Sequence, residues 1–167
     1  DTDDGEGEAW DFDPLPHRQR MYDILSDTSR PYADRLQALA DTYAVTPDAM
    51  TDAAWQNILD ELEYLHGEHR ALFATYTSDL STPTEAEPIL ERALAYFIYR
   101  HVTPAWDGED LRAALGFCLL CERLLCAMVK ANDAANDFTA VCDLARILSE
   151  EIEYSEDNTD AIKTEFS

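Results

Sequence analysis

Apolar residues recur at intervals of three and four along most of the chain, and almost no stretch alternates between apolar and polar positions. Intervals of three and four place side chains on one face of an α-helix, whereas alternation would indicate a β-strand. We therefore expect an all-α, single-domain bundle of about six to seven helices with a buried central helix.

Polar and proline-containing segments divide the first half of the chain into three expected helices, followed by a further short one in "EHRALFATYTSDL". The first helix covers His17 to Leu25. In "DTSRP", Ser29 can cap the second helix, with Pro31 in its first turn, where a missing N–H costs nothing. A third helix begins at Thr46 by the same logic, and Gly67 ends or interrupts it. Its expected apolar face consists of Trp55, Ile58, Leu59, Leu62 and Leu65.

The second half of the chain contains the expected central helix, with Asp107 as its N-cap. Its run "AALGFCLLCERLLCAMV", from Ala113 to Val129, carries no charge before Glu122 and Arg123. A membrane-spanning helix needs roughly 20 apolar residues, so this shorter run predicts a helix buried in a protein core. A helix that is apolar most of the way round belongs in the centre of a bundle.

One further helix is expected on each side of the central one. Thr82 and Glu85 match a capping box that opens the preceding helix, although Pro88 can delay its regular part, and Pro104 ends it. The connection "ANDAAND" is tight and polar, so the following helix should return antiparallel. The expected buried side of that last helix consists of Phe138, Val141, Ala145, Leu148 and Ile152.

The charge of the chain is strongly acidic, with 35 acids against 12 bases and a formal net charge of −23. Such a chain should repel nucleic acids and anionic membranes and attract basic peptides or cations. The acids are unevenly placed: residues 1–13 hold seven of them and no base, which predicts a disordered acidic arm before a helical domain at 14–167. No secretion signal is present in the sequence, which favours a cytoplasmic protein with reduced thiols.

Cysteine and histidine are the candidate metal ligands. Three cysteines lie on the expected central helix and one on its neighbour: Cys118, Cys121, Cys126 and Cys142. Thiolates suit zinc or an iron–sulfur cluster, but these cysteines are embedded among apolar residues, where free cysteine is commonly an inert core residue. His66 and His69 lie beside Glu63 and Glu68, yet without a known metal-binding spacing. We therefore predict no metal site, and a metal-binding bundle remains the least favoured hypothesis.

The segment "ARILSEEIEYSEDN", Ala145 to Asn158, resembles the closing segment of the flagellin lysine-N-methylase family. The matching positions are Arg146, Ser149, Ile152, Glu153, Ser155 and Asn158, with Tyr154 where a histidine is more usual. Three earlier segments are similar in the same order: "RMYDILSDTSRPYADRLQALADTY", "ILDELEYLHGEHRALFATY" and "ILERALAYFIYRHV", the last with Phe97 at the second aromatic position. The resemblance runs from about Arg18 to Phe166.

The resemblance implies a role in N-methylation of flagellin lysines. Members of the family carry a cysteine-rich cluster ahead of this region, which implies an iron–sulfur cluster, with S-adenosylmethionine as the methyl source. That cysteine-rich segment is absent from the 167 residues, and the helical cysteines do not match it. The chain therefore resembles the C-terminal helical part of such an enzyme, which is not expected to be catalytic alone or to hold a cofactor of its own.

Two functional hypotheses follow. In the first, the chain packs on the missing cysteine-cluster domain and supports or binds a lysine-bearing protein such as flagellin. In the second, it is a non-catalytic acidic adaptor that binds a basic protein partner. The candidate substrate-binding residues are Arg146, Glu150, Glu151, Glu153, Tyr154 and Glu156, for which a solvated helix face is the structural alternative.

Overall fold

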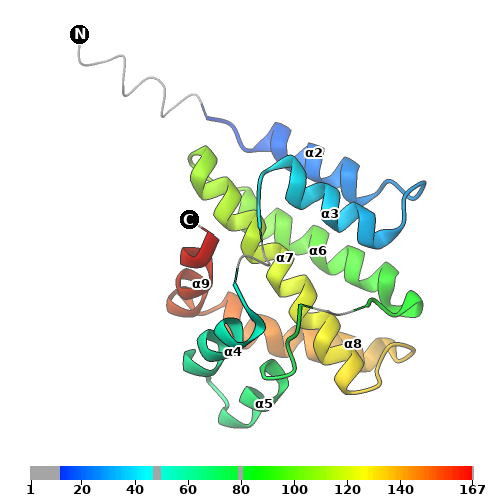
Figure 1. The fold of residues 1–167 in the computed structure, drawn as a ribbon, viewed down its shortest axis with the longest axis vertical. Coiled ribbons are helices and arrows are strands. Elements are labelled where there is room, and N and C mark those ends of the chain that lie inside the picture. Colours follow the sequence, from blue (N-terminus) through cyan, green and yellow to red (C-terminus); the bar gives the residue numbers. More distant parts are fainter. Residues whose placement is uncertain (1–11, 47–49, 79–80, 167) are drawn as a thin grey trace.

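The computed structural model describes residues 12–46, 50–78 and 81–166, and within them helices joined by turns and loops are the only regular secondary structure (Figure 1). Its α-helices are α2 (Leu15–Leu25), α3 (Tyr32–Thr42), α4 (Asp52–Glu61), α5 (Arg70–Phe73), α6 (Glu87–Val102), α7 (Gly108–Ala131), α8 (Phe138–Leu148) and α9 (Glu156–Lys163). Short 3-10 turns occur at η2 (Gly67–His69), η3 (Thr84–Ala86) and η5 (Thr164–Phe166), and η4 (Ser149–Glu153) is a π-helical turn. The predicted all-α, single-domain bundle is confirmed, with slightly more helices than expected.

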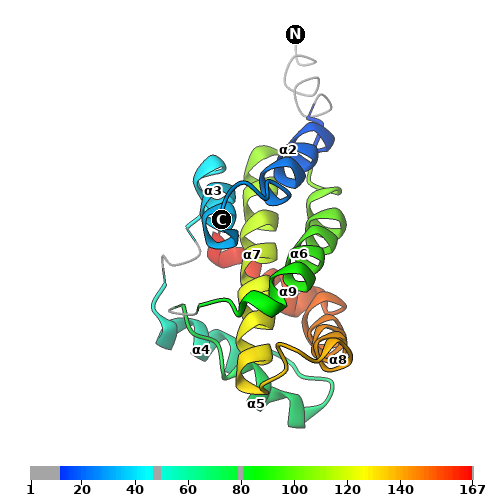
Figure 2. The same cartoon turned by 90° about the vertical axis from the view of Figure 1, so that its right-hand side faces the viewer.

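Helix α7 is the buried central helix that the sequence predicts. Figure 2 shows it upright in the middle, with α3 and α4 on one side and α6 and α8 on the other. From Leu111 to Val129, only Arg112 and Arg123 reach solvent to any extent. Asp107 caps the helix as expected, because its carboxylate accepts the N–H of Asp110 at 2.7 Å. None of the helices in the described ranges is long and apolar enough to cross a membrane.

The charges that interrupt α7 form a buried polar cluster. The side chain of Glu122 is fully buried and lies 2.6 Å from the Nε of Arg123. The hydroxyl of Tyr32, from α3, donates to the same carboxylate at 2.8 Å. Burial, reinforced by the Glu122 charge, raises the pKa of Tyr32 well above its usual value. This cluster attaches α3 to the central helix through a satisfied buried charge, which is the form that buried charges normally take.

Three predicted helix starts are wrong or shifted. Ser29 does not cap α3, because its hydroxyl donates to Asp27 at 2.5 Å and the helix begins after Pro31. Thr82 forms no capping box; its hydroxyl accepts from Arg123 at 2.8 Å, and α6 begins later, after η3. The segment expected to start α4 at Thr46 includes residues 47–49, which lie outside the described residues. The described helix is capped instead by Thr51, which accepts the N–H of Ala54 at 3.2 Å.

Two residues of the predicted apolar helix faces are exposed. Helix α4 ends at Glu61, so Leu65 lies beyond it in a loop and is 73% exposed, and Gly67 opens η2 instead of ending a helix. Phe138 is the first residue of α8 and is 66% exposed. It follows the helical phase of buried Val141, but it lines a surface groove between α6 and α8. Helical periodicity gives the face of a residue, but it does not tell whether a neighbour covers that face.

Of the predicted acidic arm, residues 1–11 lie outside the described residues. Phe12 stacks on His17 with ring centroids 6.0 Å apart, and Asp13 accepts the N–H of Leu15 at 3.0 Å. The end of the predicted arm therefore packs against the start of α2.

Candidate functional site

The C-terminal segment that carries the family resemblance begins with an irregular turn. Helix α8 continues into the five-residue π-helical turn η4, and α9 then begins after its N-cap Ser155. Glu151, Ile152 and Glu153 are consecutive and all buried. Three successive residues of a surface helix point in well-separated directions, so neighbouring segments must cover η4 on more than one side. The loop after α4 covers one side and the end of α6 covers the other.

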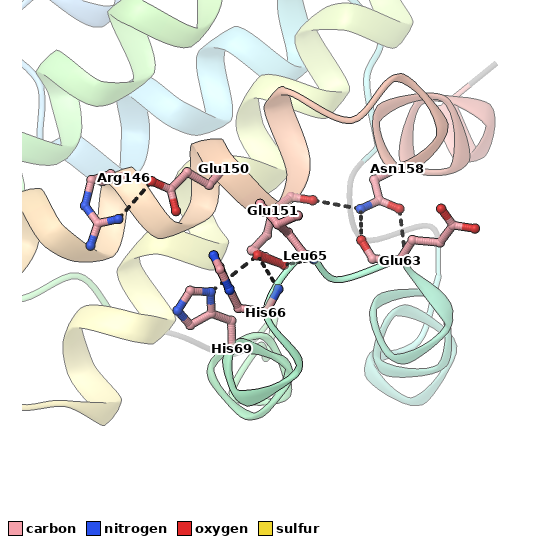
Figure 3. Close-up of polar contacts among 8 residues, drawn as sticks. All are labelled: Glu63, Leu65, His66, His69, Arg146, Glu150, Glu151 and Asn158. Atoms are coloured by element: carbon pink, nitrogen blue, oxygen red, sulfur yellow. Dashed lines mark hydrogen bonds and ion pairs between the residues drawn. The ribbon is translucent and has the colours of Figure 1, made fainter.

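Glu151 holds the loop that follows α4. Its side chain is fully buried, and its carboxylate accepts the backbone N–H groups of Leu65 at 2.8 Å and His66 at 3.1 Å (Figure 3). The Nδ1 atom of His69 lies 3.4 Å from the same carboxylate. The carboxylate is therefore satisfied by this chain's own loop.

Asn158 fastens the same loop from α9. Its amide nitrogen donates to the carbonyl oxygens of Glu63 and Glu151, both at 2.7 Å, and its amide oxygen accepts the N–H of Glu63 at 3.0 Å (Figure 3). Because Asn158 is 2% exposed, these bonds satisfy a buried amide. Together, Glu151 and Asn158 fix the backbone of residues 63–66 against η4.

Glu153 joins η4 to the end of α6. Its carboxylate lies 2.7 Å from Nε2 of His101 and accepts the hydroxyl of Ser149 at 2.6 Å. Burial opposes ionisation of Glu153, but hydrogen bonds from His101 and Ser149 and the nearby Arg100 charge outweigh it, so its pKa lies below the usual value. The ring of His101 also packs edge-on against Phe117 at 4.7 Å between centroids, which makes it a part-buried structural histidine.

The six candidate substrate-binding residues therefore separate into two groups. Glu151 and Glu153 are buried and engaged with their own chain. Arg146, Glu150, Tyr154 and Glu156 remain at the surface. Arg146 donates to Glu150 at 2.9 Å, and the guanidinium of Arg100 lies 4.6 Å from the ring centre of Tyr154, which is 61% exposed. Glu156 opens α9 and lies in its acidic first turn.

A mainly apolar groove of about 580 Å³ lies between α6 and α8. Its lining includes Ile89, Arg92, Tyr96, Phe138, Val141 and Ala145. Tyr96 is 47% exposed and Phe138 is 66% exposed. At one end the groove reaches Glu150 and Tyr154, two of the residues that the sequence predicts.

An acidic hollow of about 430 Å³ adjoins this groove. It is lined by the loop residues Glu63, Tyr64 and Leu65 and shares Glu150 and Tyr154 with the groove. The carboxylate of Glu63 makes no hydrogen bond or ion pair with any described residue. The groove and the acidic hollow thus adjoin at Glu150 and Tyr154, and together we call them the trough.

The cysteines do not fit a metal cluster. Cys118, Cys121 and Cys126 are buried in the core, and burial raises the pKa of each thiol. Cys142, which we expected in the core, is exposed and lines the groove. Within the described ranges, no three His, Cys, Asp or Glu residues come together as a metal site. The iron–sulfur cluster that the family resemblance implies would therefore find no fitting thiolate set among these residues.

Comparisons with protein-family models, with curated proteins and with solved structures found no match. The functional argument therefore depends on the trough itself. Sequence reasoning missed several of its residues, among them Glu63, Arg92, Tyr96 and Phe138. The available signal was on α6, where Arg92, Tyr96 and Tyr99 lie off the stripe of Leu90, Leu94 and Ile98.

Proposed function

We propose that this chain is the helical protein-docking domain of a lysine-N-methylase-like protein. Its trough would receive a lysine-bearing segment of a protein substrate such as flagellin. The observation that carries the proposal is the junction of the apolar groove and the acidic hollow at Glu150 and Tyr154. A segment with an apolar side chain close to a lysine can fill both parts at once.

The two parts of the trough would contribute different kinds of binding energy. Burial of apolar side chains against Tyr96 and Phe138 supplies the area-dependent part. The ammonium group would lie near the carboxylate of Glu63, while Tyr64 and Tyr154, whose rings already meet the guanidiniums of Arg70 and Arg100, would contact only the aliphatic part of the lysine. The net charge of −23 would in addition speed the approach of a basic partner at low ionic strength.

The trough suits holding a lysine more than activating one. A lysine reacts with a methyl donor as the neutral amine, but adjacent carboxylates stabilise its charged form and raise its pKa. Methyl transfer would therefore require a desolvated site supplied by the cysteine-cluster domain that the family resemblance implies. We place this docking role in the cytoplasm. The docked segment would there be presented to the catalytic domain that the family resemblance implies.

Isothermal calorimetry with the full 167-residue chain and purified flagellin tests the docking role. We expect binding that weakens at least several-fold when the lysines of flagellin are acetylated, and when Glu63→Gln or Glu150→Gln is introduced. Glu109→Gln, in the first turn of α7, removes the same charge far from the trough and should leave binding unchanged. Equal binding of native and acetylated flagellin, or no binding, would refute the proposal.

Activity distinguishes the methylase domain from the acidic adaptor. A parent protein that carries this chain after a cysteine-cluster segment should methylate flagellin and lose that activity when residues 14–166 are deleted. If lysine-dependent docking occurs but no such parent transfers methyl groups, the adaptor is the correct assignment.

A further inference from the structure

The groove between α6 and α8 has a defined direction. Near the ends of the two helical segments, Glu153 contacts His101 at 2.7 Å, and Tyr154 lies against Arg100. Ile89 and Phe138, which lie near the starts of α6 and α8, line the same groove. Because both helical segments line the groove near their starts and also meet near their ends, α6 and α8 run in broadly the same direction on its two sides.

Charge is distributed unevenly along this direction. Arg92 lies near the start of α6 and has no ion pair or hydrogen bond to any residue in the described ranges. Arg92 precedes Arg100 by eight residues, or about 12 Å of helix, which separates it from the Tyr154 end. At that end the Glu63 carboxylate has no partner among the described residues, and Arg146 and Glu150 neutralise each other at 2.9 Å. Arg100 and Arg70 also lie there, but each is paired with a carboxylate, of Glu153 and Asp60 respectively. The unpaired charges of the trough are therefore positive at Arg92 and negative at Glu63.

The shape of the groove favours a helical occupant. Its two walls are helices, and a third helix can pack against both through the usual ridges and grooves. The described residues contain no strand whose edge could pair with an extended peptide. Helix α8 has 11 residues and is about 16 Å long, which matches about three turns of a partner helix.

We propose that the occupant is an amphipathic helix of about three turns that lies antiparallel to α6 and α8. Its first turn carries the lysine, which enters the acidic hollow beside Glu63. Its last turn carries a carboxylate that pairs with Arg92. This deepens the proposed function and rests on it, because it fixes the form and orientation of the lysine-bearing segment.

Helix dipoles favour the same orientation. The N-terminus of the occupant, with its partial positive charge, would lie near the acidic hollow and the C-terminal ends of α6 and α8. Its C-terminus, with a partial negative charge, would lie beside Arg92. A lysine in the first turn and a carboxylate in the last turn oppose the occupant's own dipole, so the pairs with Glu63 and Arg92 and the dipoles of α6 and α8 together must outweigh that cost.

A displayed peptide library tests this orientation whatever the natural partner is. Each 14-residue peptide has leucine fixed at positions i, i+3, i+4 and i+7, with the other positions randomised, and the full chain is the immobilised target. We expect selected peptides to carry lysine in the first turn and aspartate or glutamate in the last. Enrichment of the opposite charge order, or of neither order, would overturn the inference.

Two synthetic peptides of identical composition then measure the effect. One has lysine first and glutamate last, and the other has the reverse. Fluorescence anisotropy at low salt should show about fivefold to tenfold tighter binding of the lysine-first peptide, since rim charges and helix dipoles contribute modestly. Arg92→Glu should abolish this preference, whereas Arg112→Glu, on the exposed side of α7, should preserve it.

The outcomes separate the two proposals. If both peptides bind equally and Glu63→Gln weakens both, the orientation is wrong and the docking role stands. If neither peptide binds the chain but flagellin does, the helical occupant is wrong and the docking role stands. A concentration-dependent dimer that Arg92→Glu disrupts would assign the groove to a second copy of the chain and overturn the inference.

Discussion

Replacing Glu151 with glutamine tests whether a buried carboxylate builds the acidic side of the trough. The substitution keeps the shape of the side chain and removes its charge. The carboxylate accepts two backbone N–H groups, from Leu65 at 2.8 Å and His66 at 3.1 Å. The amide of glutamine has only one oxygen, so its NH₂ group must face one of these donors.

The magnitude follows from these bonds. A hydrogen bond to a charged acceptor contributes about 1.5–3 kcal/mol, against about 1 kcal/mol for a neutral bond. The variant weakens one of these bonds and loses the other, which destabilises the fold. Two effects offset part of the loss: a buried charge is removed, and the partly exposed loop N–H can bind water. We expect a net loss of about 2 kcal/mol, or about 4–8 °C in Tm for a chain of this size.

Urea unfolding followed by circular dichroism measures this loss, and amide hydrogen exchange at Leu65 and His66 locates it. Glu150→Gln is the matched control, because it removes the same charge from the adjacent residue. Its i, i+4 pair with Arg146 is exposed, so stability should change by about 0.5 kcal/mol or less. If Glu151→Gln were as stable as the control and the two amides stayed protected, the reasoning would be refuted.

Three further outcomes are expected. The pKa of Glu153 is lower in the folded than in the unfolded chain, so the Glu153 carboxylate stabilises the fold above its unfolded pKa. This contribution is lost as the pH falls through the folded pKa. The stability difference between wild type and Glu153→Gln should therefore shrink below about pH 4.5. Gly116→Ala should destabilise the fold by about 1–3 kcal/mol in urea unfolding, because the new Cβ would overlap the ring of Phe166. Removal of residues 164–167 takes this ring away and should reduce the penalty. Under native conditions a maleimide reagent should label Cys142 rapidly and the three core thiols only on unfolding, so that fast labelling of more than one thiol in mass spectrometry would contradict the described core.

The parts of the fold that the sequence predicts are those that depend on local order. The central position of α7 follows from its uncharged run, and Asp107 caps it through a bond that spans three residues. The all-α class follows from the same periodicity. The predictions for Leu65 and Phe138 are wrong because a periodic pattern does not show where a helix ends or which of its faces stays uncovered.

The buried carboxylates could not be predicted from the sequence. A glutamate is normally exposed, so Glu122, Glu151 and Glu153 are each most simply interpreted as charges on a solvated face. Their partners are distant in sequence: Tyr32 lies 90 residues before Glu122, and Leu65 lies 86 residues before Glu151. The π-helical turn η4 adds to the difficulty, since it shifts the helical phase where the two glutamates enter the core.

This division of roles among neighbouring glutamates explains why the trough should behave as two separable halves. Glu151 and Asn158 hold the loop that presents Glu63, whereas α6, α8 and Leu125 of α7 line the groove that contains Arg92. A preorganised charge loses less entropy on binding than one on a free loop. Glu151→Gln should therefore weaken binding of the lysine-first and the reversed peptide, because the Glu63 end is no longer held in place. Binding of both peptides should still depend on Arg92. If the loss of Glu151 abolished the effect of Arg92→Glu as well, the carboxylate would support the whole groove, and the assignment of separate roles to its two ends would be wrong.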